Sequence, residues 1–211
     1  MKKITVAVDS FKGSLSSREV AEAFEAGFKS QFPDCEVVKV SIADGGEGTV
    51  DALVETLDGQ FIEAQVADPL GRKISAQYGV IDGGHTAVME MSAASGLPLI
   101  APEERNPLLT STYGTGEMIA DAIERGCRKF LVGIGGSATN DGGTGMLRAL
   151  GFRFFDAEGN ELIGGGEILE RIDKIDASTA RAELAECEFI VACDVTNPLY
   201  GPEGAAYVFA P

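Results

Sequence analysis

Residues 132–146 read VGIGGSATNDGGTGM, and they predict a buried strand that turns through glycines into a helix. An apolar run, 130–134, leads into the loop, and Met146, Leu147 and Leu150 follow it with helical spacing. Such a turn leaves backbone N–H groups unpaired, and the N-terminus of the next helix adds partial positive charge. The loop is therefore predicted to bind an anion, phosphate above all. The alternative is a tight, solvent-facing turn without a ligand, and the loop contains neither a P-loop pattern nor a proper GxGxxG fingerprint.

The composition is that of a chain that forms a hydrophobic core and carries a strong negative charge. Its 211 residues have a formal net charge of -16 and are 45% hydrophobic. This charge excludes nucleic acid and anionic membranes as expected partners. It also repels phosphate, so local N–H groups, a lysine or a divalent cation must offset it. The four cysteines form no CxxC pair, which argues against zinc, and we recognise neither a signal peptide nor an apolar run of membrane-spanning length, so a cytoplasmic protein is expected.

The order of predicted elements indicates an α/β fold. Residues 1–59 alternate strand and helix twice, which is typical of a parallel sheet with right-handed crossovers. Residues 60–112 contain three strands separated by short turns, which favours antiparallel pairing. From residue 113 the α/β rhythm resumes. We therefore predict a doubly wound parallel sheet, with 1–59 plus 113–211 as the nucleotide- or phosphate-binding core and 60–112 as a smaller β-rich inserted region.

Most of these elements have clear boundaries in the sequence. Strands are expected at 4–8, 37–42, 61–66, 74–81, 86–91, 130–134 and 189–193. Helices are expected at 16–32, 49–57, 117–125, from about 146 to 150 and at 167–171, and a hairpin at 152–160. Ser16 and Glu19 have the spacing of a capping box. The chain stops on an apolar run without a final helix, so we expect it to be a piece of a longer protein.

Four polar loops each follow the end of a predicted strand: 9–14, 43–49, 133–145 and 194–201. Ligands of open parallel sheets bind outside the carboxyl ends of the strands. If the four strands belong to one sheet, the loops line one edge and bring carboxylates, one lysine, amides and hydroxyls together. The sequence therefore predicts a crevice suited to phosphoryl transfer, which needs charge stabilisation and positioning more than covalent catalysis.

Three residues of these loops are the predicted catalytic groups. Lys12 would neutralise a phosphoryl group in transfer, unless it is an exposed lysine beside a turn. Asp44 precedes two glycines that let a ligand approach the backbone, and its alternative is a turn-forming aspartate. Asp194 would serve as a base for a substrate hydroxyl or as a Mg²⁺ ligand, and these two roles stay open. Asp141 is the other candidate Mg²⁺ ligand, against the alternative of a helix cap.

The motifs on these loops resemble those of the bacterial glycerate kinases, which phosphorylate D-glycerate with ATP. The matching stretches run in family order along the chain: 9–16, 43–49, 68–71, 112–116, 133–145 and 193–201. The resemblance implies an ATP- and Mg²⁺-dependent kinase with a two-domain α/β fold. It favours 2-phosphoglycerate as the product. Family members continue well beyond residue 211, so this chain resembles their N-terminal portion.

On this basis the predicted function is phosphorylation of D-glycerate by ATP. The residues expected to bind the nucleotide are Gly135, Gly136, Ser137, Thr139, Asn140 and Asn197. D-glycerate is the expected small-molecule partner, and a homodimer is a further expectation. Two alternatives are a non-catalytic nucleotide- or anion-binding fragment, and a phosphatase with Asp9 as nucleophile. The phosphatase is the weaker of the two, because Phe11 stands where such an enzyme needs a second aspartate.

Overall fold

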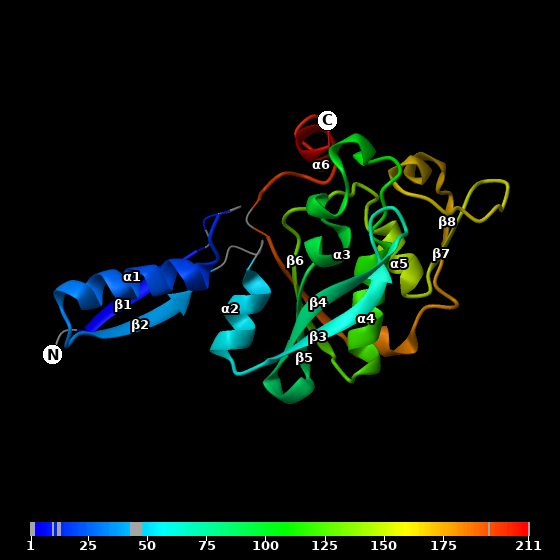
Figure 1. Ribbon diagram of the computed structural model, residues 1–211. Helices are drawn as coiled ribbons and strands as arrows, with labels where there is room; N and C mark the ends of the chain where they lie inside the picture. Colours follow the sequence, from blue (N-terminus) through cyan, green and yellow to red (C-terminus); the bar gives the residue numbers. More distant parts are fainter. Residues whose placement is uncertain (1–2, 10, 12–13, 43–47, 194, 211) are drawn as a thin grey trace.

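The centre of the molecule is a five-stranded mixed sheet. The computed structural model describes residues 3–9, 11, 14–42, 48–193 and 195–210 (Figure 1). The strands lie in the order β3 (Gln60–Ala67), β4 (Lys73–Ile81), β5 (Thr86–Glu90), β6 (Lys129–Gly133) and β9 (Glu188–Ala192). The pairs β3–β4 and β4–β5 are antiparallel, while β5–β6 and β6–β9 are parallel. The carboxyl ends of β3, β5, β6 and β9 therefore meet at one edge of the sheet.

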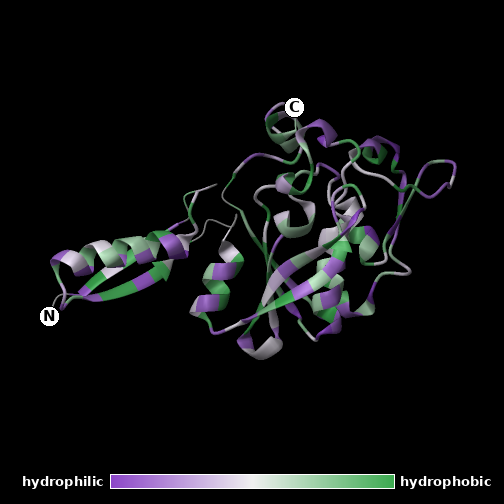
Figure 2. Ribbon diagram, in the orientation of Figure 1, coloured by the Kyte–Doolittle hydropathy of each residue, from purple (hydrophilic) through white to green (hydrophobic). Residues whose placement is uncertain are grey.

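Helices cover both faces of this sheet. On one face, α4 (Tyr113–Glu124) packs Met118 and Ile119 into a cluster with Met89 of β5. On the other face, α2 (Thr49–Thr56) packs Val54 against Val88. Neighbouring residues of β5 point to opposite faces, as the pleat requires. Figure 2 shows apolar and polar residues alternating along the sheet strands and along α4. The predicted α/β class, with helices on both faces, is confirmed.

The first three elements form a unit of their own. β1 (Lys3–Val8) and β2 (Glu36–Ser41) pair in parallel, and α1 (Ser17–Gln31) connects them. The capping box is confirmed, since Glu19 N donates to Ser16 Oγ and Ser16 N donates to the Glu19 carboxylate. In Figure 1 this unit lies beside α2, apart from the five-stranded sheet.

The expectation that the four loop-bearing strands share one sheet is therefore wrong for two of them. Within the described residues, β1 and β2 pair only with each other. The physical reason is that β5, reached through the β4–β5 hairpin, occupies the parallel position next to β6.

The antiparallel character predicted for 60–112 is confirmed for β3, β4 and β5. These strands continue the sheet of the later part of the chain, because β5 pairs with β6 from Thr86↔Lys129 to Glu90↔Gly133. One sheet thus crosses the predicted boundary at residue 112. The division into 1–59 plus 113–211 and 60–112 as domains stays a prediction.

The helix α5 (Thr144–Ala149) follows the glycine-rich loop, and several shorter elements complete the chain. They are α3 (Ser92–Ser95), β7 (Arg153–Phe155), β8 (Lys174–Asp176), α6 (Ala205–Phe209) and short 3₁₀ helices, one at Gly166–Arg171. In place of the predicted 152–160 hairpin, β7 pairs in antiparallel with β8. Its contact with the chain after the turn is an isolated bridge between Phe155 and Glu161. The expectation of no final helix is wrong, since α6 forms. None of the helices in the described part of the chain is long and apolar enough to cross a membrane.

Candidate functional site

The glycine-rich loop joins β6 to α5 and is held in place from one side. Leu97 N donates to Gly136 O at 3.0 Å, and Ala138 N donates to Ser95 O at 2.8 Å. Gly136 has a φ of 70°, in the left-handed region that favours glycine. These contacts anchor the loop to the segment after α3.

The loop also has backbone donors without an acceptor in the described part of the chain. The N–H groups of Gly135, Gly136 and Ser137 donate to none of the described residues. Gly135 and Gly136 are exposed, and Ser137 is half-buried. Consecutive open N–H groups at the carboxyl end of a parallel strand suit a negatively charged oxygen. The geometry therefore fits the anion-binding role expected of these three residues.

The hydroxyls of the loop bond mainly to the loop itself. Ser137 Oγ lies 2.9 Å from Thr139 Oγ1 and accepts from Thr139 N at 3.0 Å. Thr110 Oγ1 donates to Ala138 O at 2.7 Å. The Asn140 side chain makes no hydrogen bond to a described residue and is half-buried. Thr139 thus shapes the loop, while Asn140 retains an amide with open donors and acceptor.

Asp141 is a buried carboxylate that joins two helices. It is only 1% exposed. Its Oδ2 accepts from Thr112 N at 2.8 Å and from Gly145 N at 3.1 Å, and its Oδ1 accepts from Gly143 N at 3.0 Å. The Thr112 hydroxyl also donates to this carboxylate and accepts from Met146 N. Both oxygens therefore have protein donors at the starts of α4 and α5, which matches the capping alternative stated for this residue.

Close packing around Asp141 explains a glycine of the motif. A Cβ on Gly145 would lie 2.7 Å from Tyr113 N and 2.8 Å from Asp141 Oδ2. The starts of α4 and α5 can approach each other only because position 145 has no side chain.

The loop after β9 leaves the sheet beside the glycine-rich loop. Gly133 at the end of β6 is in register with Ala192 at the end of β9. The Asn197 amide donates to Glu203 O at 3.0 Å and closes this loop on itself. Two of the four predicted loops are thus neighbours at one edge. The three predicted catalytic residues, Lys12, Asp44 and Asp194, lie outside the described residues.

Glu90, at the end of β5, is a residue that sequence reasoning missed. Its Oε1 accepts from Val50 N, at the start of α2, at 3.1 Å. Burial raises the pKa of the Glu90 carboxyl above its usual value, and hydrogen bonds from N–H groups at the start of α2 oppose that rise. The sequence feature that could have indicated Glu90 is a carboxylate at the end of the mainly apolar strand 86–90.

The turn after β3 reaches the same edge. Asp68 is 2% exposed, and its Oδ1 accepts from Leu70 N and Arg72 N, both at 2.8 Å. Ser111 N, just before α4, donates to Pro69 O at 2.9 Å. The motif at 68–71 therefore forms a tight turn that packs against the start of α4.

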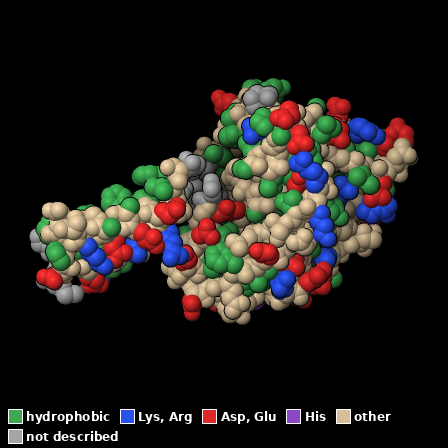
Figure 3. All heavy atoms as spheres, in the orientation of Figure 1, with side chains coloured by type: hydrophobic (Ala, Val, Ile, Leu, Met, Phe, Trp, Pro, Cys, Tyr) green, Lys and Arg blue, Asp and Glu red, His purple; other side chains and the backbone are tan. Residues whose placement is uncertain are grey.

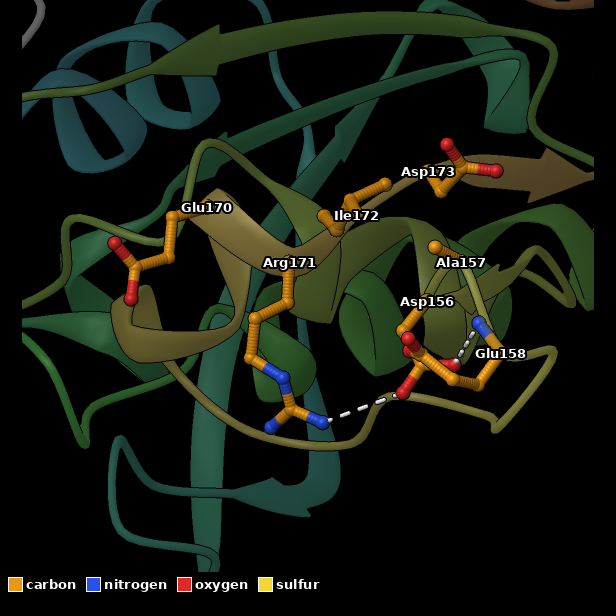
Figure 4. Close-up of a pocket in the computed structure, with 7 residues that line it drawn as sticks. All are labelled: Asp156, Ala157, Glu158, Glu170, Arg171, Ile172 and Asp173. Atoms are coloured by element: carbon orange, nitrogen blue, oxygen red, sulfur yellow. Dashed lines mark hydrogen bonds and ion pairs between the residues drawn. The ribbon is translucent and has the colours of Figure 1, made fainter.

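A separate pocket of about 300 Å³ lies beside β7 (Figure 4). Asp156 and Arg171 point toward each other there, with an oxygen and a nitrogen 3.4 Å apart. Hydrogen bonds, led by one from the Asn160 side chain, lower the pKa of the Asp156 carboxyl. Asp156 thus bonds within the turn after β7 and also pairs with Arg171 at the end of the 3₁₀ helix Gly166–Arg171. The pocket contains none of the predicted site residues.

The distribution of charged side chains and of possible metal ligands bears on what the chain can bind. Acidic and basic side chains are interspersed over the face drawn in Figure 3 rather than gathered into a basic patch. Among the described residues, no three His, Cys, Asp or Glu side chains group closely enough to hold a metal ion.

Comparison with known proteins gives one consistent result. A glycerate kinase from Bacillus subtilis (strain 168) is 52% identical over 209 residues, which are 99% of this chain and 55% of that protein. A glycerate 2-kinase from Escherichia coli (strain K12) is 51% identical, with the same two coverages of 99% and 55%. A crystal structure from Salmonella typhimurium LT2 that bears the name glycerate kinase 2 has a TM-score of 0.89 at 50% identity, covering 100% of this chain and 56% of that one. The chain thus spans about half the length of the curated relatives that it matches. The model of the glycerate kinase family matches residues 4–211, and this chain therefore belongs to that family.

Proposed function

We propose that this chain provides the phosphate-binding part of an ATP-dependent kinase that phosphorylates D-glycerate to 2-phosphoglycerate. One observation carries the proposal: the open N–H groups of Gly135, Gly136 and Ser137 lie at the carboxyl end of β6, beside the loop that follows β9. Relatives named glycerate kinase, which are 52% and 51% identical to this chain, support glycerate as the substrate. The alternative of a phosphatase has no comparable support, because Phe11 takes the place of the second aspartate.

Each group of residues has its own role in the proposed reaction. The N–H groups of 135–137 bind phosphate oxygens, and the amides of Asn140 and Asn197 orient the nucleotide and substrate. ATP supplies the phosphoryl group when it is bound. Lys12 offsets negative charge on the group in transfer. Asp44 or Asp194 accepts the proton of the glycerate hydroxyl, whose oxygen forms the new bond to the γ-phosphorus of ATP, while the bond from that phosphorus to the β–γ bridging oxygen breaks and ADP leaves.

Magnesium is the less well-supported cofactor. Phosphoryl transfer commonly uses Mg²⁺, and Asp141 and Asp194 are the proposed ligands. However, both Asp141 oxygens already accept hydrogen bonds from protein donors, and the described residues do not group into a ligand set. We therefore derive no step through the metal ion. A homodimer and a cytoplasmic location remain expectations.

Phosphorus NMR with ATP, Mg²⁺ and D-glycerate tests the reaction and its product together. The assay is run on this chain and on a longer one of the relatives' length. We expect a 2-phosphoglycerate signal from the longer chain. A signal of 3-phosphoglycerate would correct the proposed product. If neither product appears with the longer chain, the proposed kinase activity is rejected. Calorimetry that shows ATP binding without turnover would favour the non-catalytic binding module.

Replacing Lys12 tests the proposed charge compensation. Because preorganised charge of this kind acts mainly on the transition state, Lys12→Ala is expected to lower kcat by about 100-fold or more. It should leave the thermal midpoint nearly unchanged. Lys174→Ala, on β8, is the matched control and should keep wild-type turnover. An unchanged kcat in Lys12→Ala would remove Lys12 from the mechanism.

A further inference from the structure

The helix α2 has no cap from its own residues. Its N-cap is Gly48, with a φ of 92°, and no side chain within the helix start accepts from its first N–H groups. Unpaired N–H groups at a helix start require an acceptor from elsewhere. Here the acceptor comes from a different element.

Glu90 supplies that acceptor from the carboxyl end of β5. Its carboxylate, half-buried, receives Val50 N at 3.1 Å, across 40 positions of the sequence. A carboxylate at this place also interacts favourably with the helix dipole. The apolar contact of Val54 with Val88 fixes the same helix to the same strand. Together, one polar and one apolar contact determine where α2 begins.

Glu90 also lies next to the glycine-rich loop. It is in register with Gly133, the last residue of β6, and Met91 N donates to Gly133 O at 2.9 Å. The segment that carries Asp44 leads directly into α2. The Glu90 side chain therefore links the start of α2 to the edge where β6 leads into the glycine-rich loop.

We propose that Glu90 is a positioning residue that fixes the start of α2 beside the strand that leads into the glycine-rich loop. Its effect on catalysis rests on the proposed glycerate kinase activity. Its hydrogen bond to the start of α2 is independent of that activity.

Hydrogen exchange measured by mass spectrometry tests the hold directly. The N–H of Val50 should exchange at least tenfold faster in Glu90→Ala than in the wild type, because its acceptor is gone. Glu90→Gln keeps an acceptor oxygen and should recover most of the protection. Asp156→Ala is the matched control, since Asp156 is also a carboxylate that accepts backbone N–H groups, in the turn after β7. It should leave exchange at Val50 unchanged.

Kinetics of the same variants in the longer chain test the consequence. Glu90→Ala should lower kcat/KM for D-glycerate about tenfold and leave KM for ATP unchanged, with Glu90→Gln closer to the wild type. Unchanged exchange at Val50 in Glu90→Ala overturns the proposal. Faster exchange with unchanged glycerate kinetics overturns the positioning role, since the cap is then only structural. If the wild type fails to phosphorylate glycerate while Val50 exchanges faster, the proposed function fails and the hold of Glu90 on α2 is supported.

Discussion

Asp141→Asn separates two roles for the central carboxylate of the glycine-rich motif. In the structure, Asp141 joins α4 to α5 through hydrogen bonds from Thr112 N, Gly143 N and Gly145 N. The sequence also made it a candidate Mg²⁺ ligand. Asparagine has nearly the same shape, so the substitution changes charge and hydrogen bonding without opening a cavity.

The expected loss can be worked out from these contacts. Asparagine has a single carbonyl oxygen, which is most favourable at the Oδ2 position because it still accepts hydrogen bonds from Thr112 N and Gly145 N there. The amide NH₂ then faces Gly143 N, which loses its acceptor. One partly buried donor left unpaired costs about 1–3 kcal/mol, and the two retained bonds lose their charge assistance. We expect the free energy of unfolding to fall by about 2–4 kcal/mol.

Urea unfolding without nucleotide or metal, followed by circular dichroism, measures this loss. Asp156→Asn is the matched control, because it also replaces a carboxylate that accepts backbone N–H groups but lies in the turn after β7. If the role of Asp141 is structural, Asp141→Asn lowers the free energy of unfolding by the same amount with and without Mg²⁺. An unfolding free energy within about 0.5 kcal/mol of the wild type would refute the reasoning, most clearly if Mg²⁺ then failed to stabilise the variant.

Three further substitutions extend the test to packing and charge. Gly145→Ala should destabilise the fold by about 1–3 kcal/mol, because its Cβ would lie 2.7 Å from Tyr113 N; equal stability in urea would contradict the close approach. Gly27→Ala, in the interior of α1 with nothing within 4 Å, should instead stabilise by about 0.5–1 kcal/mol. Hydrogen bonds, from Lys29 first, lower the pKa of Glu25 from 4.5 to about 2, so its stabilising contribution is present above pH 4.5 and disappears as the pH falls toward 2. Glu25→Gln should flatten that part of a plot of unfolding midpoint against pH, and salt should weaken the effect; parallel plots for the variant and the wild type would disprove it.

Local features of the fold could be predicted because they depend on neighbouring residues. The capping box of Ser16 and Glu19 and the antiparallel strands of 60–112 follow from spacing and turn residues a few positions apart. The start of α4 was placed four residues late, since Tyr113 and the glycines after it do not favour a helix by themselves. Tertiary contacts of those glycines, with Ala67 and Met146, allow the earlier start.

The order of the strands could not be predicted in the same way. Hydrophobic patterns show that β1 and β2 are strands but not which strand each one pairs with. The same limit applies to Glu90, since its partner is a helix that begins about 40 positions earlier in the chain. Sequence spacing does show that Asp141 precedes a helix. Its second partner, Thr112, becomes visible only when α4 and α5 pack together.

The arrangement around the glycine-rich loop explains why three N–H groups can stay open without disorder. Gly136 O, Ala138 N and Thr139 N, which flank the open N–H groups, all have partners inside the protein. Asp141 then ties the end of the loop to α4. An anion that binds the open N–H groups therefore does not need to order the loop, and the ordering entropy is already offset by folding. Donors that are fixed before the ligand arrives are also what charge stabilisation in phosphoryl transfer requires, because they need no reorganisation as the charge develops. The many bonds of Asp141 to the protein thus preorganise the proposed phosphate site even if that carboxylate never touches the ligand or a metal ion.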